Sequence, residues 1–235
     1  MMPIRGILFD KDGTLVDFEA TWATLARSMA LKAADGDAAR ADFLLDQSGL
    51  DLATNRFRAD SIFAAGTNAD VVELWHPHLE GEALATTIAR FDAWTAVEAS
   101  KSAVALPGAG AALMRLREAG LVLGVATNDS TEAGRLTVEA LGWAPRFRAV
   151  YGYDSVPRPK PAPDVVFAFA KLTGLSPAEI AFVGDNRHDL ETGRAAHAGL
   201  VVGVLSGTGT RAALAPLADV ILASVADLPE WLEDC

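Results

Sequence analysis

The sequence contains almost no cysteine, because Cys235 is the single one among 235 residues. One thiol allows neither an intramolecular disulfide nor a cysteine metal cluster, and Cys235 is expected to be solvent-exposed. Long apolar runs are also missing, since none approaches the roughly 20 residues of a membrane-spanning helix. Patterned core sequence begins at Ile4, which leaves no room for a cleavable signal. These absences favour a protein of the reducing cytoplasm with no membrane partner.

Positive charge is scarce as well. The chain has 20 lysine and arginine residues against 31 aspartate and glutamate residues, a formal net charge of −11. A nonspecific nucleic-acid binder needs a basic face that displaces counterions from phosphates, so a nucleic-acid partner is not expected. A small anionic substrate is compatible with this charge, because a metal ion and one lysine reverse the potential inside a cleft.

Six short apolar runs, each ending in small or acidic residues, predict buried strands. Stretches with helical periodicity separate them, which is the alternation of a parallel sheet covered on both faces. We therefore predict an α/β fold with a Rossmann-like, doubly wound parallel sheet. The predicted strands are residues 4–10, 121–128, 149–154, 180–185, 200–205 and 219–223, and the predicted helices include residues 108–119, 130–141, 162–172 and 190–198.

One long segment, residues 18–94, interrupts this alternation. Its apolar positions have helical spacing, and it contains no clear strand. We predict that it is an inserted α-helical cap domain, and that residues 1–17 and 95–235 form the core. Residues 95–107 lose strong periodicity and end in a Leu-Pro-Gly sequence, which is expected to form a hinge back into the core.

Ligands of open parallel sheets bind beyond the carboxyl ends of the strands, so polar residues just after each apolar run are candidate site residues. The first group is Asp10-Lys11-Asp12-Gly13-Thr14. The carboxylates of Asp10 and Asp12 project to one side of an extended segment, where one can attack while the other handles protons. Gly13 lets the backbone turn and expose amide groups to a phosphate. An aspartate-rich turn that closes a strand would explain this motif if it stood alone.

Two further groups lie after later strands. Thr127 and Asn128 come directly before a helix, where a hydroxyl and the amides of a helix N-terminus can hold phosphate oxygens. Ser130 is better explained as a helix cap. Lys160 lies in a segment that three prolines restrain, and its compact ammonium suits the neutralisation of charge between a nucleophile and a phosphate. Taken alone, Lys160 would be a solvated loop charge.

The fourth group follows the predicted strand at residues 180–185. Asp185 can supply an oxygen ligand for Mg²⁺, a hard cation that takes few protein carboxylates and keeps some waters. Asp189, four residues on, can orient Lys160 or a metal-bound water. The Ser-Gly-Thr-Gly-Thr sequence at residues 206–210 lacks the lysine of a Walker motif and is expected to be a strand-to-helix connection.

In this order, each after a strand, the four groups resemble the haloacid dehalogenase superfamily of hydrolases, whose first motif is Asp-x-Asp-Gly-Thr. The resemblance covers residues 4–17 and 107–205. The helical insertion sits where many members carry a cap between the first and second motifs. Asn186 departs from the family pattern, because many relatives have a small hydroxyl residue after the Gly-Asp pair.

The resemblance implies a role for each residue that matches a family motif. Asp10 would attack phosphorus and form an aspartyl-phosphate, while Asp12 would first protonate the leaving alkoxide and then activate water. Thr127 and Lys160 would bind phosphoryl oxygens. The Asp10 carboxylate, the backbone carbonyl of Asp12 and Asp185 would hold Mg²⁺, so that catalysis is mainly positioning and charge neutralisation.

Members with this kind of cap include phosphoglycolate phosphatases, so the resemblance favours a magnesium-dependent phosphatase that acts on a small phosphorylated metabolite. Arg56, Arg58 and Ser61 are candidates for substrate selection, because a closing cap could bring a guanidinium to a substrate carboxylate or a second phosphate. Surface charges on a helix are the alternative interpretation. The sequence leaves open whether the protein is a monomer or a homodimer.

A core of this kind is compatible with other functions. A dehalogenase would not need the carboxylate of Asp12, and a phosphonate hydrolase would need a cap lysine, for which Lys32 is the one candidate well inside the insertion. A sugar phosphomutase has nearly the same core and moves phosphate within its substrate. A noncatalytic sensor of phosphorylated metabolites is the alternative of another class, because a fold alone does not establish turnover.

Overall fold

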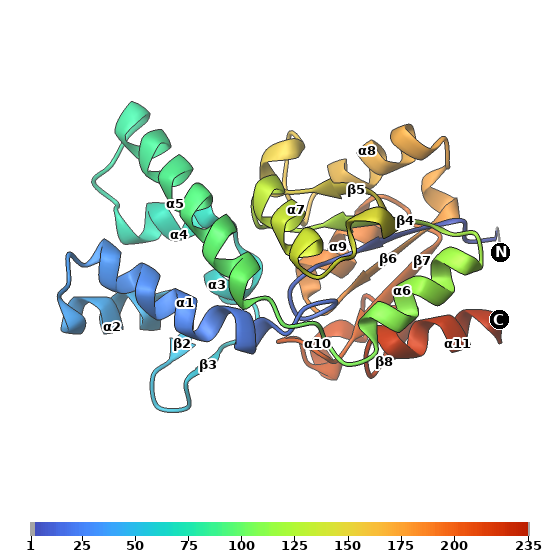
Figure 1. Cartoon of the computed structure of the whole chain (residues 1–235), viewed down its shortest axis with the longest axis horizontal. Coiled ribbons are helices and arrows are strands. Elements are labelled where there is room, and N and C mark those ends of the chain that lie inside the picture. Colours follow the sequence, from blue (N-terminus) through green and yellow to red (C-terminus); the bar gives the residue numbers. More distant parts are fainter. Residues whose placement is uncertain (1–2, 235) are drawn as a thin grey trace.

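The structure, a computed structural model, describes residues 3–234 and is built on one sheet of six parallel strands (Figure 1). The strand order is β5-β4-β1-β6-β7-β8, which places the first strand of the chain in the middle. All six predicted strands are present, and the predicted doubly wound α/β fold is confirmed. The strands are β1 (Gly6–Phe9), β4 (Val122–Ala126), β5 (Phe147–Tyr151), β6 (Ile180–Gly184), β7 (Leu200–Val204) and β8 (Val220–Leu222).

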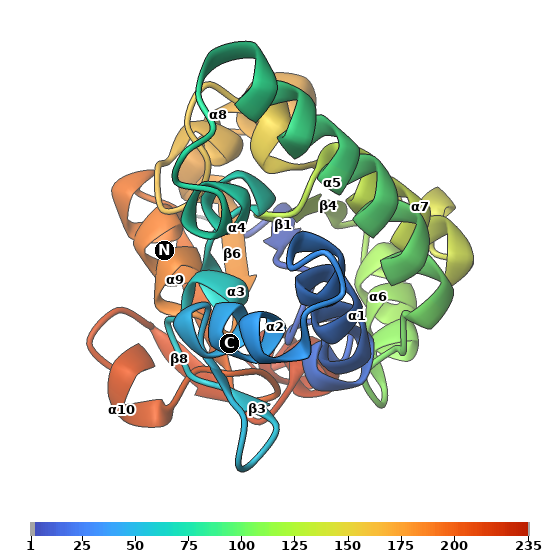
Figure 2. The ribbon, with the colours of Figure 1, turned by 90° about the vertical axis from the view of Figure 1, so that its left-hand side faces the viewer.

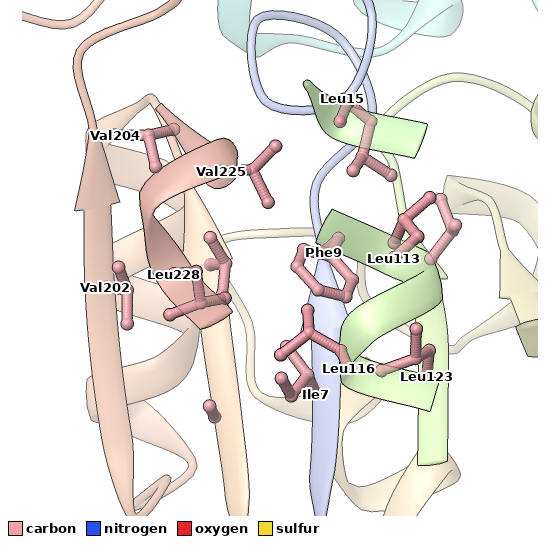
Figure 3. Packing of buried hydrophobic residues seen from close by; sticks show 14 of the residues in the cluster. Ile7, Phe9, Leu15, Leu113, Leu116, Leu123, Val202, Val204, Val225 and Leu228 are labelled. Atoms are coloured by element: carbon pink, nitrogen blue, oxygen red, sulfur yellow. The ribbon is translucent and has the colours of Figure 1, made fainter. Parts of the chain in front are cut away.

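The two faces of the sheet follow from the two-residue period of its strands. Ile7 and Phe9 of β1 belong to the cluster on one face and Leu8 to the cluster on the other, and all three are fully buried. Figure 3 shows Ile7 and Phe9 beside Leu113 and Leu116 of α6. The helices of the core are α6 (Ala109–Glu118), α7 (Thr131–Ala140), α8 (Asp164–Thr173), α9 (Arg187–Ala195), α10 (Arg211–Leu214) and α11 (Leu228–Glu233).

This packing anchors the residue that follows β1. Full burial of a large apolar side chain such as Phe9 contributes roughly 1.5–3 kcal/mol. The amide of Asp10 donates to the carbonyl of Val183 on β6 at 2.8 Å, which continues the pairing of β1 one residue further. The backbone of Asp10 is therefore held by the most buried part of the sheet.

The segment between β1 and α6 is mostly helical and forms a lobe beside the core (Figure 1). Figure 2 looks onto this lobe, which lies in front of the sheet. Its interior is aromatic: Phe63 stacks on Phe57 with ring centroids 5.1 Å apart, and its ring also contacts Trp22 and Trp75. The lobe thus has an apolar core of its own. Its elements are α1 (Phe18–Ala33), α2 (Ala38–Gln47), β2 (Leu50–Asp51), β3 (Arg56–Phe57), α3 (Ile62–Ala65), α4 (Asn68–Trp75) and α5 (Gly81–Ser102).

The short hairpin of β2 and β3 is a correction to the sequence analysis, which expected no strand in this segment. The two strands pair antiparallel, with Leu50 opposite Phe57. Both side chains are buried in the aromatic core of the lobe. Strands of two residues are too short to produce an alternating pattern, so the periodicity of the sequence could not indicate them.

Helix α5 is a second correction. It continues to Ser102, whereas the sequence analysis expected helical periodicity to be lost after residue 94. Thr95 and Ala99 are small side chains buried on its inner side, so this part of the helix lacks the large apolar residues that mark a helical face. Because α5 crosses the expected boundary, the division into core and cap stays a prediction.

Two expectations concern the environment of the chain. Within residues 3–234, no helix has both the length and the apolar character that a bilayer crossing requires. Cys235, for which the sequence predicts an exposed thiol, lies outside the described residues.

Candidate active site

The candidate residues that follow separate strands come together beyond the carboxyl end of the sheet. Asp10 follows β1, Asp185 follows β6 and Lys160 lies in the loop before α8, and all three line one cavity. The ammonium of Lys160 lies 2.5 Å from Oδ1 of Asp10 and 2.6 Å from Oδ1 of Asp189. Residues up to 179 positions apart in the chain therefore share one buried cluster.

Negative charge accumulates in this cluster. Asp10, Asp185 and Asp189 are buried and offer carboxylate oxygens that lie within 4.8 Å of one another. Burial, together with the neighbouring Asp189, raises the pKa of Asp10 to about 7, against the opposing effect of Lys160. Burial also raises the pKa of Asp185 well above its usual value, and Asp10 and Asp189 add to this effect. One ammonium does not compensate three buried carboxylates.

A divalent cation fits this cluster, because hard cations bind carboxylate oxygens and would offset the excess negative charge. Asp189 uses Oδ1 for Lys160 and Oδ2 for the amide of Asn186, at 3.0 Å. Both of its oxygens are thus engaged, which suits Asp189 to orienting Lys160. The expectation that Asp10 and Asp185 hold the metal ion stays a prediction, because all three carboxylates lie within reach of one ion.

Two segments position the carboxylate of Asp185. The amide of Thr208 donates to its Oδ2 at 2.9 Å, and the hydroxyl of Thr14 lies 3.4 Å from its Oδ1. Glycines make these approaches possible, because a Cβ atom at Gly13 or Gly207 would lie 2.7 or 2.0 Å from the Asp185 carboxylate. Residues 206–210 connect β7 to α10, as the sequence predicts, and they also shape the site.

Gly13 has a backbone φ of +82°, in the left-handed region that favours glycine. Its amide donates to the carbonyl of Val16 at 2.7 Å, and its carbonyl accepts from the hydroxyl of Ser206 at 2.7 Å. The turn that the sequence predicts is therefore present, with its amide bonded inside the turn. Phosphate binding by Gly13 stays a prediction.

Thr127 and Asn128, which follow β4, also line the cavity. The hydroxyl of Thr127 accepts from the amide of Asp129 at 3.1 Å, which leaves its hydrogen for a phosphate oxygen. Oδ1 of Asn128 accepts from the Lys160 amide at 3.1 Å, and its Nδ2 donates to the carbonyls of Ala65 and Lys160 at 2.8 and 3.1 Å. The Asn128 side chain thus holds the backbone of Lys160. A contact of Asn128 with phosphate would use its backbone N–H group.

Asp12 lies beside the acidic cluster with partners of its own. Nζ of Lys11 lies 2.5 Å from Oδ2 of Asp12 and 3.3 Å from Oδ2 of Asp129, and the Trp22 indole donates to Oδ1 of Asp12 at 3.0 Å. Lys11 is only 1% exposed. Burial lowers its pKa, but Asp12 and Asp129 outweigh burial and raise the pKa above its usual value. Burial raises the pKa of Asp129 to about 6, although Lys11 opposes the shift.

The helical lobe between β1 and α6 lines the cavity from the side opposite the sheet. The carbonyl of Ala65, the last residue of α3, accepts from Asn128 at 2.8 Å and lies 3.3 Å from Nδ1 of His188. The hydroxyl of Tyr153 donates to Asp92 of α5 at 2.6 Å. The cavity has a volume of about 60 Å³, far below the roughly 300–1,000 Å³ of ordinary ligand pockets. This position of the lobe therefore leaves little room for a substrate.

The residues that the sequence suggests for substrate selection lie outside this cavity. Arg56 is exposed on β3, and Arg58 forms an exposed ion pair with Asp46 at 3.1 Å. Ser61 accepts from the amide of Ala64 and caps α3. None of the three lines the cavity, so their part in substrate selection stays a prediction that needs another position of the cap.

The sequence analysis missed several residues of this site. Lys11 lies between Asp10 and Asp12 in the first motif. This position in the sequence could have indicated that Lys11 is part of the site. Thr208 belongs to the glycine-rich residues 206–210, which the sequence favoured as a simple connection. Trp22 and His188 carried no comparable signal, because their contacts depend on how the helical lobe packs against the core. Such contacts are formed by tertiary packing and leave no local pattern.

Comparison with known proteins shows the family of the chain. A family model described as haloacid dehalogenase-like hydrolase matches residues 4–197. The phosphoglycolate phosphatase of Escherichia coli (strain K12) is 31% identical over 200 residues, which cover 82% of this chain and 78% of the relative. That of Yersinia pseudotuberculosis is 31% identical over 231 residues, covering 96% of this chain and 91% of the relative.

A solved structure of similar fold comes from Haemophilus somnus 129pt, where the protein is described as a predicted phosphoglycolate phosphatase. It has a TM-score of 0.73 and 23% sequence identity, and the match covers 98% of this chain and 99% of that one. The similarity to this solved structure shows a shared fold, whereas the family model and the two relatives show similarity of sequence. On these grounds the chain belongs to the haloacid dehalogenase-like hydrolases, the family that its motifs resemble.

Proposed function

We propose that the protein is a Mg²⁺-dependent phosphatase that hydrolyses a small phosphomonoester, of the size of phosphoglycolate, through an aspartyl-phosphate on Asp10. The observation that carries this proposal is the contact of Lys160 with Asp10 and Asp189 beside Asp185, in one cavity under the cap. The names of the curated relatives support phosphoglycolate as the size class of the substrate.

The proposed reaction has two steps. In the first, a carboxylate oxygen of Asp10 attacks phosphorus, the bond from phosphorus to the leaving oxygen breaks, and Asp12 gives its proton to that oxygen. In the second, Asp12 takes a proton from water, the water oxygen attacks phosphorus, and the bond from phosphorus to Asp10 breaks. Asp10 regains its carboxylate, and inorganic phosphate leaves.

The other residues bind and position the phosphoryl group. The hydroxyl of Thr127 and the ammonium of Lys160 would hold its nonbridging oxygens, and the backbone amide of Asn128 would assist. The amide of Gly13 would join them only by giving up its bond to the carbonyl of Val16. Asp189 keeps Lys160 aimed at Asp10 from 2.6 Å.

The acidic cluster would hold the metal. Asp10, Asp185 and the backbone carbonyl of Asp12 would bind Mg²⁺, which when bound supplies positive charge that offsets the charge of the phosphoryl group. The proposed cap, residues 18–94, would position the leaving group and exclude bulk water when closed.

Phosphate release from a panel of small phosphomonoesters tests the proposal. We expect release with Mg²⁺ and none after addition of a chelator. An Asp10→Asn variant should lose roughly a thousandfold or more of the turnover, as expected when a nucleophile is removed. Asp42→Asn is the matched control, because Asp42 is exposed on α2 and does not line the cavity. Full activity of Asp10→Asn would contradict the assignment of the nucleophile.

The same panel separates the competing functions. Binding without release on every ester would favour a noncatalytic sensor, and phosphate that moves within a sugar phosphate would favour a mutase. A phosphonate hydrolase would need Lys32 in the cavity. Lys32 instead lies over the ring of Trp94, at 5.2 Å, and does not line the cavity.

A further inference from the structure

We infer that the substrate leaves as an uncharged alcohol, and that the enzyme disfavours phosphomonoesters whose leaving group carries a carboxylate or a second phosphate. This inference rests on the proposed function and narrows its substrate class. It follows from the part of the cavity wall that the cap supplies, which faces the sheet. If Asp10 and Lys160 hold the phosphoryl group, the leaving group would lie against this wall.

The side chains of this wall are mostly apolar. Phe18 and Trp22 of α1, Ile62 and Phe63 of α3, and Val71 of α4 all line the cavity. The polar group among them, the Trp22 indole N–H, donates to Asp12 at 3.0 Å and is thereby used. A carboxylate placed against these side chains would lose water and gain no hydrogen-bond donor from them.

The backbone of the wall offers few donors as well. The amides of residues 63–67 are all bonded inside the cap. Their acceptors are the carbonyls of Ser48, Ser61 and Ile62 and the carboxylate of Asp70. Because a buried amide has a single hydrogen to donate, these groups cannot also bind an anion without breaking a bond of the cap.

The N-terminus of α4 is the place on this wall where an anion would otherwise be favoured. It is occupied: Oδ2 of Asp70 accepts from both the amide and the hydroxyl of Thr67, at 2.7 and 2.8 Å. Nδ2 of the next residue, Asn68, donates to Asp92 and Thr95 at 2.9 and 3.0 Å. A second carboxylate at this helix end would meet the charge of Asp70 instead of an open donor.

Cations that could pair with a charged leaving group are absent from this wall, since no lysine or arginine of the cap lines the cavity within residues 3–234. On the core side, Lys160 is bonded to Asp10 and Asp189. His188 is directed at the carbonyl of Ala65, at 3.3 Å, and its Nδ1 must carry the hydrogen in that contact. A negatively charged leaving group would thus be buried without a positively charged side chain that is free to pair with it.

A pair of two-carbon esters that differ mainly in charge tests the inference. We would measure kcat/KM, with Mg²⁺, for phosphoglycolate and for 2-hydroxyethyl phosphate, in which a neutral hydroxymethyl group replaces the carboxylate. Glycerol phosphate and 3-phosphoglycerate extend the comparison to three carbons. We expect the best neutral ester to exceed the best carboxylate ester at least tenfold, since an unpaired buried charge discriminates strongly.

A carboxylate ester that is hydrolysed as fast as the best neutral ester would overturn the inference and leave the phosphatase proposal standing. If an Arg56→Ala/Arg58→Ala double variant also hydrolysed the carboxylate ester more slowly but the neutral ester at the native rate, this would show that another position of the cap brings the two guanidinium groups to the substrate. Release from no ester, and none from acetyl phosphate, would instead refute the phosphatase proposal itself.

A gain-of-charge variant approaches the question from the other side. Ile62→Arg places a guanidinium on the apolar wall at a half-buried position. We expect it to raise the ratio of kcat/KM for phosphoglycolate over 2-hydroxyethyl phosphate at least tenfold. A folded variant, shown by cooperative unfolding, in which this ratio does not change would contradict the view that the wall disfavours charge.

Discussion

At the scale of single residues, the site depends on approaches that a larger side chain would prevent. A Cβ atom at position 207 would lie 2.0 Å from Oδ2 of Asp185. We predict that Gly207→Ala displaces this carboxylate and raises the half-saturating Mg²⁺ concentration by roughly tenfold or more, as for other changes around metal ligands. Titration of activity with Mg²⁺ measures the effect. Gly203→Ala is the control, since its nearest atom, on Leu214, would lie at 3.4 Å, and equal Mg²⁺ curves for both variants would refute the prediction.

Lys11 is a buried charge that the proposed reaction does not use directly. It contacts Asp12 and Asp129 at 2.5 and 3.3 Å. Removing one member of a buried ion pair leaves the other uncompensated, so we predict that Lys11→Met lowers the free energy of unfolding by about 3 kcal/mol. Adding Asp129→Asn removes one stranded charge and should restore part of this loss, which urea denaturation measures.

The same pair of variants separates stability from positioning. If Lys11 holds Asp12 in place, the double variant regains stability while its kcat stays below that of the native enzyme. A double variant that is no more stable than Lys11→Met would show that Lys11 and Asp129 do not interact energetically.

The sequence indicates which residues meet where their position alone is informative. Asp10 and Asp185 directly follow apolar runs, and strand ends of a parallel sheet converge, so their meeting could be expected before any coordinates. The contact of Trp22 with Asp12 could not, because it depends on how α1 packs against the core. The exposed position of Arg58 likewise follows from a pairing with Asp46 that has no sequence signature.

At the scale of elements, hydrophobic runs located all six core strands. The inner strands β1, β4, β6 and β7 are buried almost throughout and are therefore continuously apolar, while the edge strands β5 and β8 are only partly buried. The hairpin of β2 and β3 and the end of α5 escaped prediction for opposite reasons. The hairpin strands are only two residues long, and the end of α5 is long but buries small side chains. Burial by small residues leaves no periodic signal.

One hydrogen bond links the short 3₁₀ turn at residues 153–155 to α5. The hydroxyl of Tyr153 donates to Asp92 at 2.6 Å, and burial raises the pKa of Asp92. We predict that Tyr153→Phe lowers the free energy of unfolding by about 1–3 kcal/mol, the range for a bond to a charged partner, and changes KM because cap closure weakens. Urea denaturation and steady-state kinetics measure both.

The other tyrosine of the chain is a matched control for that variant. Tyr151 on β5 is partly buried, and no hydrogen bond of its hydroxyl is found among the described residues. Tyr151→Phe should therefore change stability by less than about 0.5 kcal/mol. Similar effects of the two variants would show that the bond between Tyr153 and Asp92 does not help to hold the cap.

At the scale of the whole molecule, the buried acidic cluster couples folding to pH and to metal. A carboxyl group with a higher pKa in the folded than in the unfolded chain binds more protons when folded, so its contribution to stability falls as pH rises. The pKa of Asp10 is raised to about 7, and those of Asp185 and Asp129 are raised in the same direction. The metal-free protein should thus be less stable at pH 8 than at pH 6, by about 1 kcal/mol from Asp10 alone.

Mg²⁺ should reverse this trend, because it binds the ionised carboxylates and competes with protons. We predict that saturating Mg²⁺ raises the melting temperature more at pH 8 than at pH 6. The comparison within each pH cancels the opposite contribution of His76, whose pKa is lowered by burial and by the nearby His78. Differential scanning calorimetry with Mg²⁺ and with a chelator measures the four values. Equal Mg²⁺ shifts at the two pH values, or a full shift in Asp185→Asn, would mean that the ion does not bind where the buried carboxylates accumulate charge.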